Sequence, residues 1–226
     1  MHFCLFDIDG TLISSGGAGK AALEAALAAE FGIPAISDQL TLSGRTDRAI
    51  VADLVRFHEL ALCSTTNQRL TDSYLRHHPA SLAAGCGLIL PGILPLLEKL
   101  REQKNVVLGL LTGNTHAGAR IKLEHFGLWE YFDFGAFGDE HEDRDDVARA
   151  AWVEVSRRHN NSRPDRAWVI GDTPLDIRCA RAIGAGAVAV ATGWHSLDEL
   201  AAHNPDLLFS DLTNPAPLLA RLDETP

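Results

Sequence analysis

The spacing of apolar residues changes along the chain and divides it into a helical part and a mixed part. After a first apolar run at residues 3–6, apolar positions recur at helical spacing, and little between residues 13 and 85 is typical of a strand. Beyond Pro91, short apolar runs alternate with amphipathic segments. In the first part the pattern predicts helices over 18–31, 46–58 and 68–82.

The second part is an alternation of strands and helices. Its apolar runs predict strands over 105–111, 131–137, 167–170 and 187–191, and a last edge strand near Phe209. Its amphipathic segments predict helices over 94–103, 117–125, 145–160 and 175–183, and a C-terminal helical turn. Strands joined through helices form a parallel sheet that is covered on both faces. We therefore expect an α/β core, residues 1–14 and 87–226, interrupted by an all-helical domain, residues 15–86.

Composition and charge limit the partners of this protein. The chain has 226 residues, 46% of them hydrophobic, and a formal net charge of −10. This balance argues against nucleic acid and anionic membranes, since no excess of cations remains to neutralise phosphates. No apolar stretch approaches the roughly 20 residues that cross a bilayer, and Asp7 and Asp9 interrupt the apolar run that a signal peptide would need. Four scattered cysteines, expected to be reduced and buried, fit a cytoplasmic setting, and no protein partner is inferred.

Acidic and hydroxyl side chains follow three of the predicted strands. Asp7 and Asp9 come directly after the first strand, and Thr112, Asp172 and Asp176 follow two of the others. The carboxyl ends of parallel strands meet at one edge of the sheet, where ligands bind. Carboxylates that share a cavity repel one another unless a cation lies between them, and Mg²⁺ is a hard ion that prefers such oxygens. Taken alone, the first pair is also compatible with an acidic turn that ends the strand.

Three motifs, in this order and spacing, resemble those of the haloacid dehalogenase (HAD) superfamily of phosphohydrolases. They are Asp-x-Asp-Gly-Thr at 7–11, Leu-Leu-Thr-Gly-Asn at 110–114 and Gly-Asp-Thr-Pro-Leu-Asp at 171–176. The resemblance covers essentially the whole chain and implies a Rossmann-like parallel sheet as the core. The helical insert is similar to the C1 cap of the phosphoglycolate phosphatase and β-phosphoglucomutase branch.

The resemblance implies a role for each residue of these motifs. Asp7 is expected to be the nucleophile that accepts the phosphoryl group, and Asp9 the general acid and then the base that activates water. The metal ligands would be Asp7, the backbone carbonyl of Asp9, and Asp172. Asp176 and Thr11 would orient that cluster from outside it. The phosphoryl oxygens would be bound by Thr112, the Gly113 amide and Asn114.

The family also requires a cation beside the nucleophile, and two residues are candidates for it. The common form is a Lys-Pro pair beyond the aromatic strand, where this chain has Arg144 and no lysine. Lys122 lies on the helix that follows Thr112, and members of this branch use such an upstream lysine. We favour Lys122, with Arg144 as the alternative or as part of the ion pairs of its own acidic loop.

Substrate selection is expected from the insert, and segment 42–47 is its most suggestive part. Arg45 resembles the arginine of the cap's specificity loop, which can reach a substrate carboxylate or a second phosphate. The alternative is a helix N-terminus that is capped by Thr46 or Ser43, with Arg45 paired to Asp47.

Other conspicuous residues are expected to be structural. The segment 14–20 superficially resembles a nucleotide-binding P-loop but lacks its first glycine and its last hydroxyl residue, so we interpret it as a hinge with a solvated Lys20. His77 and His78 precede a proline and are interpreted as a helix end, and Trp194 is expected to pack against the core.

Together these observations predict a magnesium-dependent phosphatase that hydrolyses a small phosphorylated metabolite, a phosphomonoester, through an aspartyl-phosphate. A phosphomutase shares the catalytic residues and differs in how the cap controls water, so it stays open as an alternative. A non-catalytic module that binds a nucleotide or a partner is a further alternative from a different class.

Overall fold

The computed structural model describes residues 1–158 and 166–223, and its centre is a parallel sheet. Six strands pair in the order β5-β4-β1-β6-β7-β8, and every pairing between neighbours is parallel. This confirms the predicted α/β core. The strands are β1 (His2–Phe6), β4 (Val106–Leu111), β5 (Phe134–Ala136), β6 (Arg166–Gly171), β7 (Gly186–Val190) and β8 (Leu207–Phe209).

Helices cover both faces of this sheet, which explains why its strands are apolar throughout. Alternate residues of β1 belong to different hydrophobic clusters, Cys4 and Phe6 to one and Phe3 and Leu5 to the other. The first cluster includes α4 (Ile93–Arg101), α5 (His116–His125) and α9 (Ala216–Asp223). The second includes α6 (Arg144–Arg158), α7 (Pro174–Ile183) and α8 (Leu197–Ala201).

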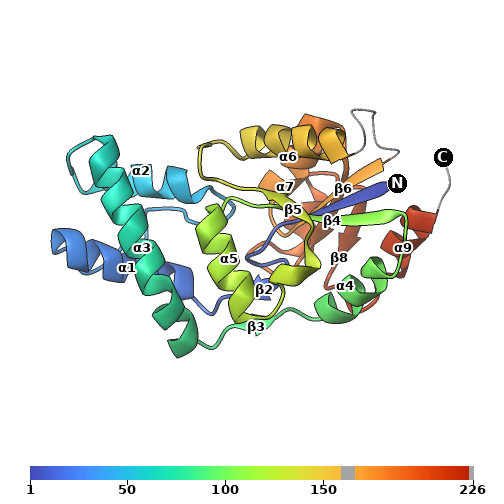
Figure 1. The fold of residues 1–226 in the computed structure, drawn as a ribbon, viewed down its shortest axis with the longest axis horizontal. Coiled ribbons are helices and arrows are strands. Elements are labelled where there is room, and N and C mark those ends of the chain that lie inside the picture. The colour runs from blue at the N-terminus through green and yellow to red at the C-terminus, as the bar shows by residue number, and fades with distance from the viewer. Residues whose placement is uncertain (159–165, 224–226) are drawn as a thin grey trace.

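The chain between β1 and β4 contains three helices with a hydrophobic core of their own. They are α1 (Ala18–Phe31), α2 (Asp47–Phe57) and α3 (Ser64–Ala84). Leu27, Leu54, Leu70 and Tyr74 are among the buried residues of that core. Figure 1 shows these helices gathered at one end of the molecule, with α5 between them and the sheet. We call residues 15–86 the helical insert; its boundaries stay a prediction.

The two connections of the insert to the core lie side by side. Strand β2 (Ile13–Ser14) pairs antiparallel with β3 (Leu88–Ile89), so the expectation that no strand occurs near residues 13–85 was wrong at its first end. Gly16 and Gly17 follow β2 with φ of 60° and 84°, a backbone region that favours glycine. The segment that resembled a P-loop is therefore the turn into α1.

Several other local predictions were wrong. The predicted strand 131–137 is too long, because its first residue ends a 3₁₀ helix, η1 (Trp129–Tyr131), and only 134–136 form a strand, β5. Trp194 is 88% exposed and does not pack against the core, and Cys63 and Cys86 are exposed. Residues 159 and 160, the end of a predicted helix, lie outside the described residues.

Helix α3 continues through Pro79, so His77 and His78 lie inside a helix and not at its end. In the described parts of the chain, no helix combines the length and the apolar character that crossing a membrane requires.

Candidate active site

The two aspartates of the first motif leave β1 at its carboxyl end. The amide of Asp7 donates to the Ile170 carbonyl at 2.9 Å, which extends the pairing of β1 with β6 by one residue. Ile8 is fully buried and anchors the turn, and Gly10 reverses the backbone there with φ of 80°. The chain thus holds Asp7 in the core, where it is 4% exposed, while Asp9 lies further out.

Asp7 belongs to a cluster of three buried carboxylates. Oxygens of Asp7, Asp172 and Asp176 lie within 4.8 Å of one another, at the ends of β1 and β6 and in the first turn of α7. One Asp176 oxygen accepts from the amide and the hydroxyl of Thr173, at 3.0 and 2.7 Å, as the capping box of α7. Thr11 donates to Asp172 at 3.3 Å. The topology therefore brings together residues that are far apart in the sequence.

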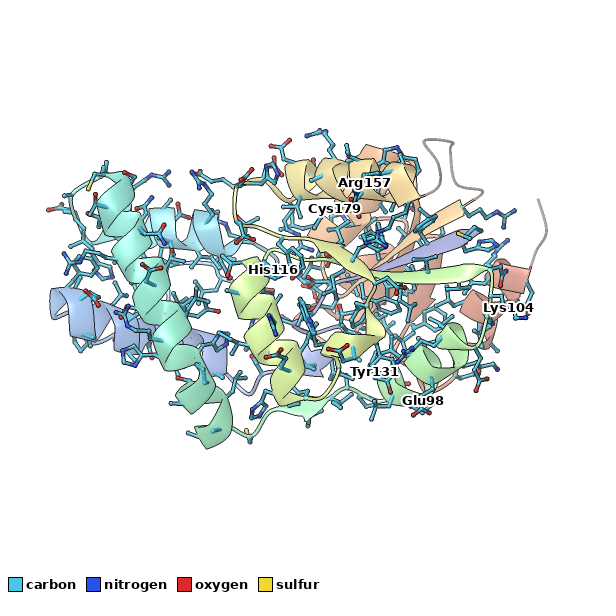
Figure 2. The ribbon with its side chains drawn as sticks, viewed as in Figure 1. Glu98, Lys104, His116, Tyr131, Arg157 and Cys179 are labelled. Carbon is cyan, nitrogen blue, oxygen red and sulfur yellow. The ribbon has the colours of Figure 1, made fainter. Side chains whose placement is uncertain are left out.

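Arg144 is the cation of this cluster. Its side chain is 3% exposed, and its guanidinium donates to Asp7 at 3.3 Å and to the other Asp176 oxygen. The expectation that Arg144 serves the ion pairs of its own loop was wrong, because Arg178 makes those pairs, with Asp143 and Asp145. Cys179, labelled on α7 beneath α6 in Figure 2, donates its Sγ–H to the Arg144 carbonyl at 3.3 Å.

The cluster holds more negative charge than Arg144 neutralises, and the pKa values reflect this. Burial raises the pKa of Asp7 to about 7, with Asp176 and Asp9 adding to the rise and Arg144 opposing it. Burial, together with the charges of Asp176 and Asp7, raises the pKa of Asp172 to about 9. The carboxylates can all be ionised together once a further cation is present.

The donor set of this cluster fits a hard divalent ion. It offers carboxylate oxygens and no histidine or cysteine among the described residues of the group, which suits Mg²⁺ better than Zn²⁺. A Cβ atom on Gly10 or Gly193 would collide with the Asp172 carboxylate, so glycine backbone closes around this side chain on two sides. Such a cradle keeps the site small and fixes the direction of Asp172.

Asp9 has different neighbours. Lys122 of α5 donates from Nζ to Asp9 Oδ2 and to Asn114 Oδ1, both at 2.5 Å, and Asn114 Nδ2 donates to the same Asp9 oxygen at 2.9 Å. Burial alone would raise the pKa of Asp9, but the charge of Lys122 and these hydrogen bonds hold it below its ordinary value. The Asp9 side chain is 39% exposed and that of Lys122 only 5%. Lys122 and Arg144 therefore both lie at the site, each beside a different aspartate.

The segment after β4 lies between these aspartates and the insert. Thr112 is fully buried, and its hydroxyl oxygen accepts from Asn114 Nδ2 at 2.9 Å, which leaves its own proton to donate elsewhere. Gly113 is overlain by the insert, because a Cβ atom there would collide with the Arg45 carbonyl. The predicted phosphate-binding segment is thus beside Asp9 and under the insert.

The specificity segment of the insert is docked on the core. Thr46 caps α2 by accepting from the Ala49 amide at 3.1 Å, as predicted for a helix N-terminus. The Asp47 amide donates to Gly113 at 2.7 Å, and its carboxylate accepts from the Thr115 amide at 2.7 Å. His116, labelled at the start of α5 in Figure 2, follows this contact. These hydrogen bonds join the first turn of α2 to the first turn of α5.

Arg45 lies in this segment with its side chain 33% exposed. It forms an ion pair with Asp53, which lies within α2, so the alternative in which Arg45 pairs with Asp47 was wrong. Its role toward a substrate stays a prediction.

Sequence reasoning missed three residues of the insert, the half-buried Asp47 and the buried Tyr74 and His78. Burial raises the pKa of Asp47 to about 6, against the effect of Lys122. Tyr74 and His78 lie on the buried face of α3, and the charge of Asp9 acts on both. The signal that could have found the last two is a stripe at intervals of four residues along α3, Thr66, Leu70, Tyr74, His78 and Leu82.

Comparisons with known proteins agree with this geometry. Residues 4–190 match the sequence pattern of the family described as haloacid dehalogenase-like hydrolase. The chain is 29% identical to the phosphoglycolate phosphatase of Synechococcus elongatus, over 97% of this chain and 96% of that protein. It is 26% identical to the probable phosphatase IndB of Dickeya dadantii, over 98% of this chain and 96% of that protein.

A solved structure shares the fold. The crystal structure of CbbY from Rhodobacter sphaeroides in complex with phosphate superimposes with a TM-score of 0.75 and 20% identity, over 95% of this chain and 96% of that chain. The family match spans most of the sequence and includes all three motifs. The chain therefore belongs to the haloacid dehalogenase-like hydrolases, the family that its motifs predicted, and the relatives it resembles along their length are named as phosphatases.

Proposed function

We propose that this protein is a magnesium-dependent phosphatase that hydrolyses a small phosphomonoester through an aspartyl-phosphate on Asp7. The observation that carries the proposal is the contrast between the two aspartates of one motif. Asp7 lies in a buried cluster of three carboxylates with one guanidinium, that of Arg144, whereas Asp9 is partly exposed and bound by Lys122 and Asn114. Two carboxyl groups in opposite environments are suited to opposite roles, nucleophile and proton carrier.

The metal would be held by Asp7, by the backbone carbonyl of Asp9 and by Asp172. Both oxygens of Asp176 are engaged, by Arg144 and by Thr173, which supports its role as an orienting residue. When bound, Mg²⁺ would keep these carboxylates ionised and polarise a phosphoryl group.

The side chains would divide the reaction as follows. An Asp7 oxygen attacks phosphorus and the bond from phosphorus to the ester oxygen breaks, while Asp9 gives its proton to the leaving alkoxide. Asp9 then takes a proton from water, the water oxygen attacks phosphorus, and inorganic phosphate leaves as Asp7 is regenerated. Asp9 must be protonated for the first half, and the negative charge of an arriving phosphate raises its pKa and favours that state.

The phosphoryl oxygens would be held by Thr112, the Gly113 amide and Asn114, with Arg144 balancing charge on the Asp7 side. Thr112 retains a hydroxyl proton that Asn114 does not use, which supports this assignment. The names of the relatives favour 2-phosphoglycolate as a first substrate to test.

The test is release of inorganic phosphate from 2-phosphoglycolate and from phenyl phosphate, with Mg²⁺ and with a chelator. We expect turnover that needs Mg²⁺ and falls by at least about 10⁴-fold in Asp7→Asn, since the nucleophile is lost. Asp38→Asn is a matched control, because its carboxylate is 98% exposed on the insert. A phosphate detected by mass spectrometry on the Asp7 peptide after acid quench would identify the intermediate.

Equal phosphate release by the wild type, the chelated protein and Asp7→Asn would contradict the proposal. Isomerisation of a sugar phosphate without release of phosphate would instead favour the phosphomutase alternative. Binding of nucleotides that is indifferent to Asp7→Asn would favour a non-catalytic module.

A further inference from the structure

A buried histidine on the insert has no role in the mechanism described above. His78 lies in the middle of α3 with no exposed surface. Within the described residues, neither Nδ1 nor Nε2 of its ring has a hydrogen-bond partner. A neutral imidazole carries one donor and one acceptor, and burying both without partners costs free energy. Since buried polar groups are nearly always paired in native proteins, this exception requires an explanation.

The position of His78 along α3 places it at the border with the core. Helix α3 packs against α5 as well as against α1. Leu75 of α3 approaches Gly118 of α5, since a Cβ atom on that glycine would lie 3.7 Å from Leu75 Cδ2. One further turn along each helix leads to His78 on α3 and to Lys122 on α5. His78 therefore faces the end of the site at which Lys122 binds Asp9.

The surroundings of the ring fix both its orientation and its charge. Tyr74, one turn earlier, lies against it with ring centroids 4.8 Å apart and planes inclined by 34°. Burial, helped by the charge of Lys122 and opposed by that of Asp9, lowers the pKa of His78 to about 3. The ring is therefore neutral near pH 7 and keeps one N–H group and one free lone pair.

We propose, on the basis of the phosphatase function above, that His78 determines specificity by donating a hydrogen bond to an oxygen of the alcohol part of the substrate. Asp9 is the residue that protonates the leaving oxygen, so a side chain of the insert beside Asp9 meets the alcohol and not the phosphoryl group. Lys122 is engaged by Asp9 and Asn114, and Arg45 by Asp53, whereas neither ring nitrogen of His78 has a partner among the described residues. The preferred ester thus carries a second oxygen, in a hydroxyl or a carboxylate.

Three esters separate these possibilities in a kinetic test. 2-Phosphoglycolate offers a carboxylate, glycerol 3-phosphate offers hydroxyls, and phenyl phosphate offers no oxygen beyond the ester. His78→Leu should lower kcat/KM for one or both of the first two by about 10-fold, the effect of one hydrogen bond. The change for phenyl phosphate should be smaller than about 3-fold. His78→Gln, which keeps an N–H donor, should recover part of the loss.

A stability measurement distinguishes this role from simple packing. Because His78→Leu removes an unpaired buried polar group, it should raise the thermal midpoint by about 2–4 °C while activity falls. His77→Leu, on the neighbouring and less buried position of α3, is the matched control and should change neither the ester preference nor the midpoint by a comparable amount.

The failure of this inference can be told apart from failure of the phosphatase function. Affinity of the inactive Asp7→Asn protein for the same three esters, measured by calorimetry, reports on His78 without turnover. Suppose that the wild type hydrolyses none of the three esters, but adding His78→Leu to Asp7→Asn weakens binding of the two esters that carry a second oxygen. That result would reject the phosphatase function and keep the recognition role of His78. Equal losses for all three esters, with a lowered midpoint, would overturn the inference and assign His78 to packing.

Discussion

The site has two halves that are enclosed in different ways. The first, which we call the sealed half, consists of residues from the sheet and the helices that cover it. These are Asp7, Arg144, Asp172 and Asp176, and each is at most 4% exposed. In the boundary half, Asp9 is 39% exposed at its side chain, and Lys122 and Asn114 bind it. The charges of Lys122 and Asp9 act on His78 of the insert, which we infer to belong to this second half.

Neighbouring residues of one motif obtain their properties from distant parts of the chain. Asp7 and Asp9 are one residue apart, yet the pKa of the first is raised to about 7 and that of the second is lowered. The difference arises because burial, with the charges of Asp176 and Asp9, outweighs Arg144 and raises the pKa of Asp7. At Asp9, Lys122 and the hydrogen bonds from Lys122 and Asn114 outweigh burial and lower the pKa. The sheet therefore determines the surroundings of Asp7, the proposed nucleophile, and the border with the insert determines those of Asp9, the proposed proton carrier.

The largest effect that we expect to distinguish the two halves is the loss of kcat in Asp9→Asn, which should depend on whether the leaving group needs a proton. Asp9→Asn removes the proton carrier, and we expect kcat to fall by about 10²–10⁴-fold for 2-phosphoglycolate, the range for general acid–base catalysis. The loss should be much smaller for formation of the aspartyl-phosphate from p-nitrophenyl phosphate, because that leaving group needs no proton. Single-turnover release of nitrophenolate measures this step.

Asp7→Asn serves as the control in that experiment, since loss of the nucleophile is independent of the leaving group. If both variants lost the same factor with both esters, the division of roles between the two aspartates would be contradicted.

The next effect concerns stability and tests whether the sealed half depends on its own cation. Arg144→Met leaves buried carboxylates without their partner and should lower the free energy of unfolding by about 3–5 kcal/mol. Lys122→Met should cost less, because Asp9 reaches solvent. Urea denaturation of the metal-free proteins gives these values.

Arg178→Met is the matched control, because Arg178 also pairs with two aspartates but lies 49% exposed on the surface. Its loss should change stability by less than about 1 kcal/mol. An Arg144→Met protein as stable as this control would show that the sealed half does not need its cation.

The smallest effect is the dependence of metal-free stability on pH. Asp172 titrates near 3.9 when unfolded and at about 9 when folded, so the folded protein holds one more proton between these pH values. Stability should therefore fall as pH rises through this window, by at most about 1.4 kcal/mol per pH unit, and Asp7 adds to the slope below pH 7. Thermal unfolding at pH 6 and pH 8 with a chelator measures the slope.

Asp172→Asn removes this titration and should flatten the slope. Mg²⁺ should raise the midpoint more at pH 8 than at pH 6, because it binds the ionised carboxylates. An identical slope in the wild type and the variant would contradict a raised pKa in the sealed half.

The parallel strands were predictable because they are buried on both faces. Predicted strands 105–111, 167–170 and 187–191 agree with β4, β6 and β7 to within one residue at each end. The pair β2 and β3 has two residues in each strand, too few to produce a pattern, and its partners are far apart in the sequence. Around β5, aromatic residues pack against the core from a 3₁₀ turn as well as from a strand, so their alternation gave a strand that was too long.

The site was predictable where topology alone brings residues together. Asp7, Thr112 and Asp172 follow adjacent strands, so their meeting is a consequence of strand order. The choice between Lys122 and Arg144 was not predictable, because it depends on the path of each long side chain. The structure brings both cations to the site. His78 was missed because its position depends on how α3 packs against α5.

The short β2–β3 ribbon has a consequence for how this architecture can be rebuilt. Both connections of the insert leave the core at one point, where Gly16 lies so close to the backbone of Cys86 and Gly87 that a Cβ atom would contact it. When the two ends of an insertion lie together, the core does not have to move to accommodate it. The same two ends can be joined by a tight turn or by another domain. We therefore expect the predicted insert, residues 15–86, to be exchangeable. A chimera that carries another helical domain between Ser14 and Gly87 should keep the sheet, and its preference among phosphate esters would test whether the insert selects the substrate.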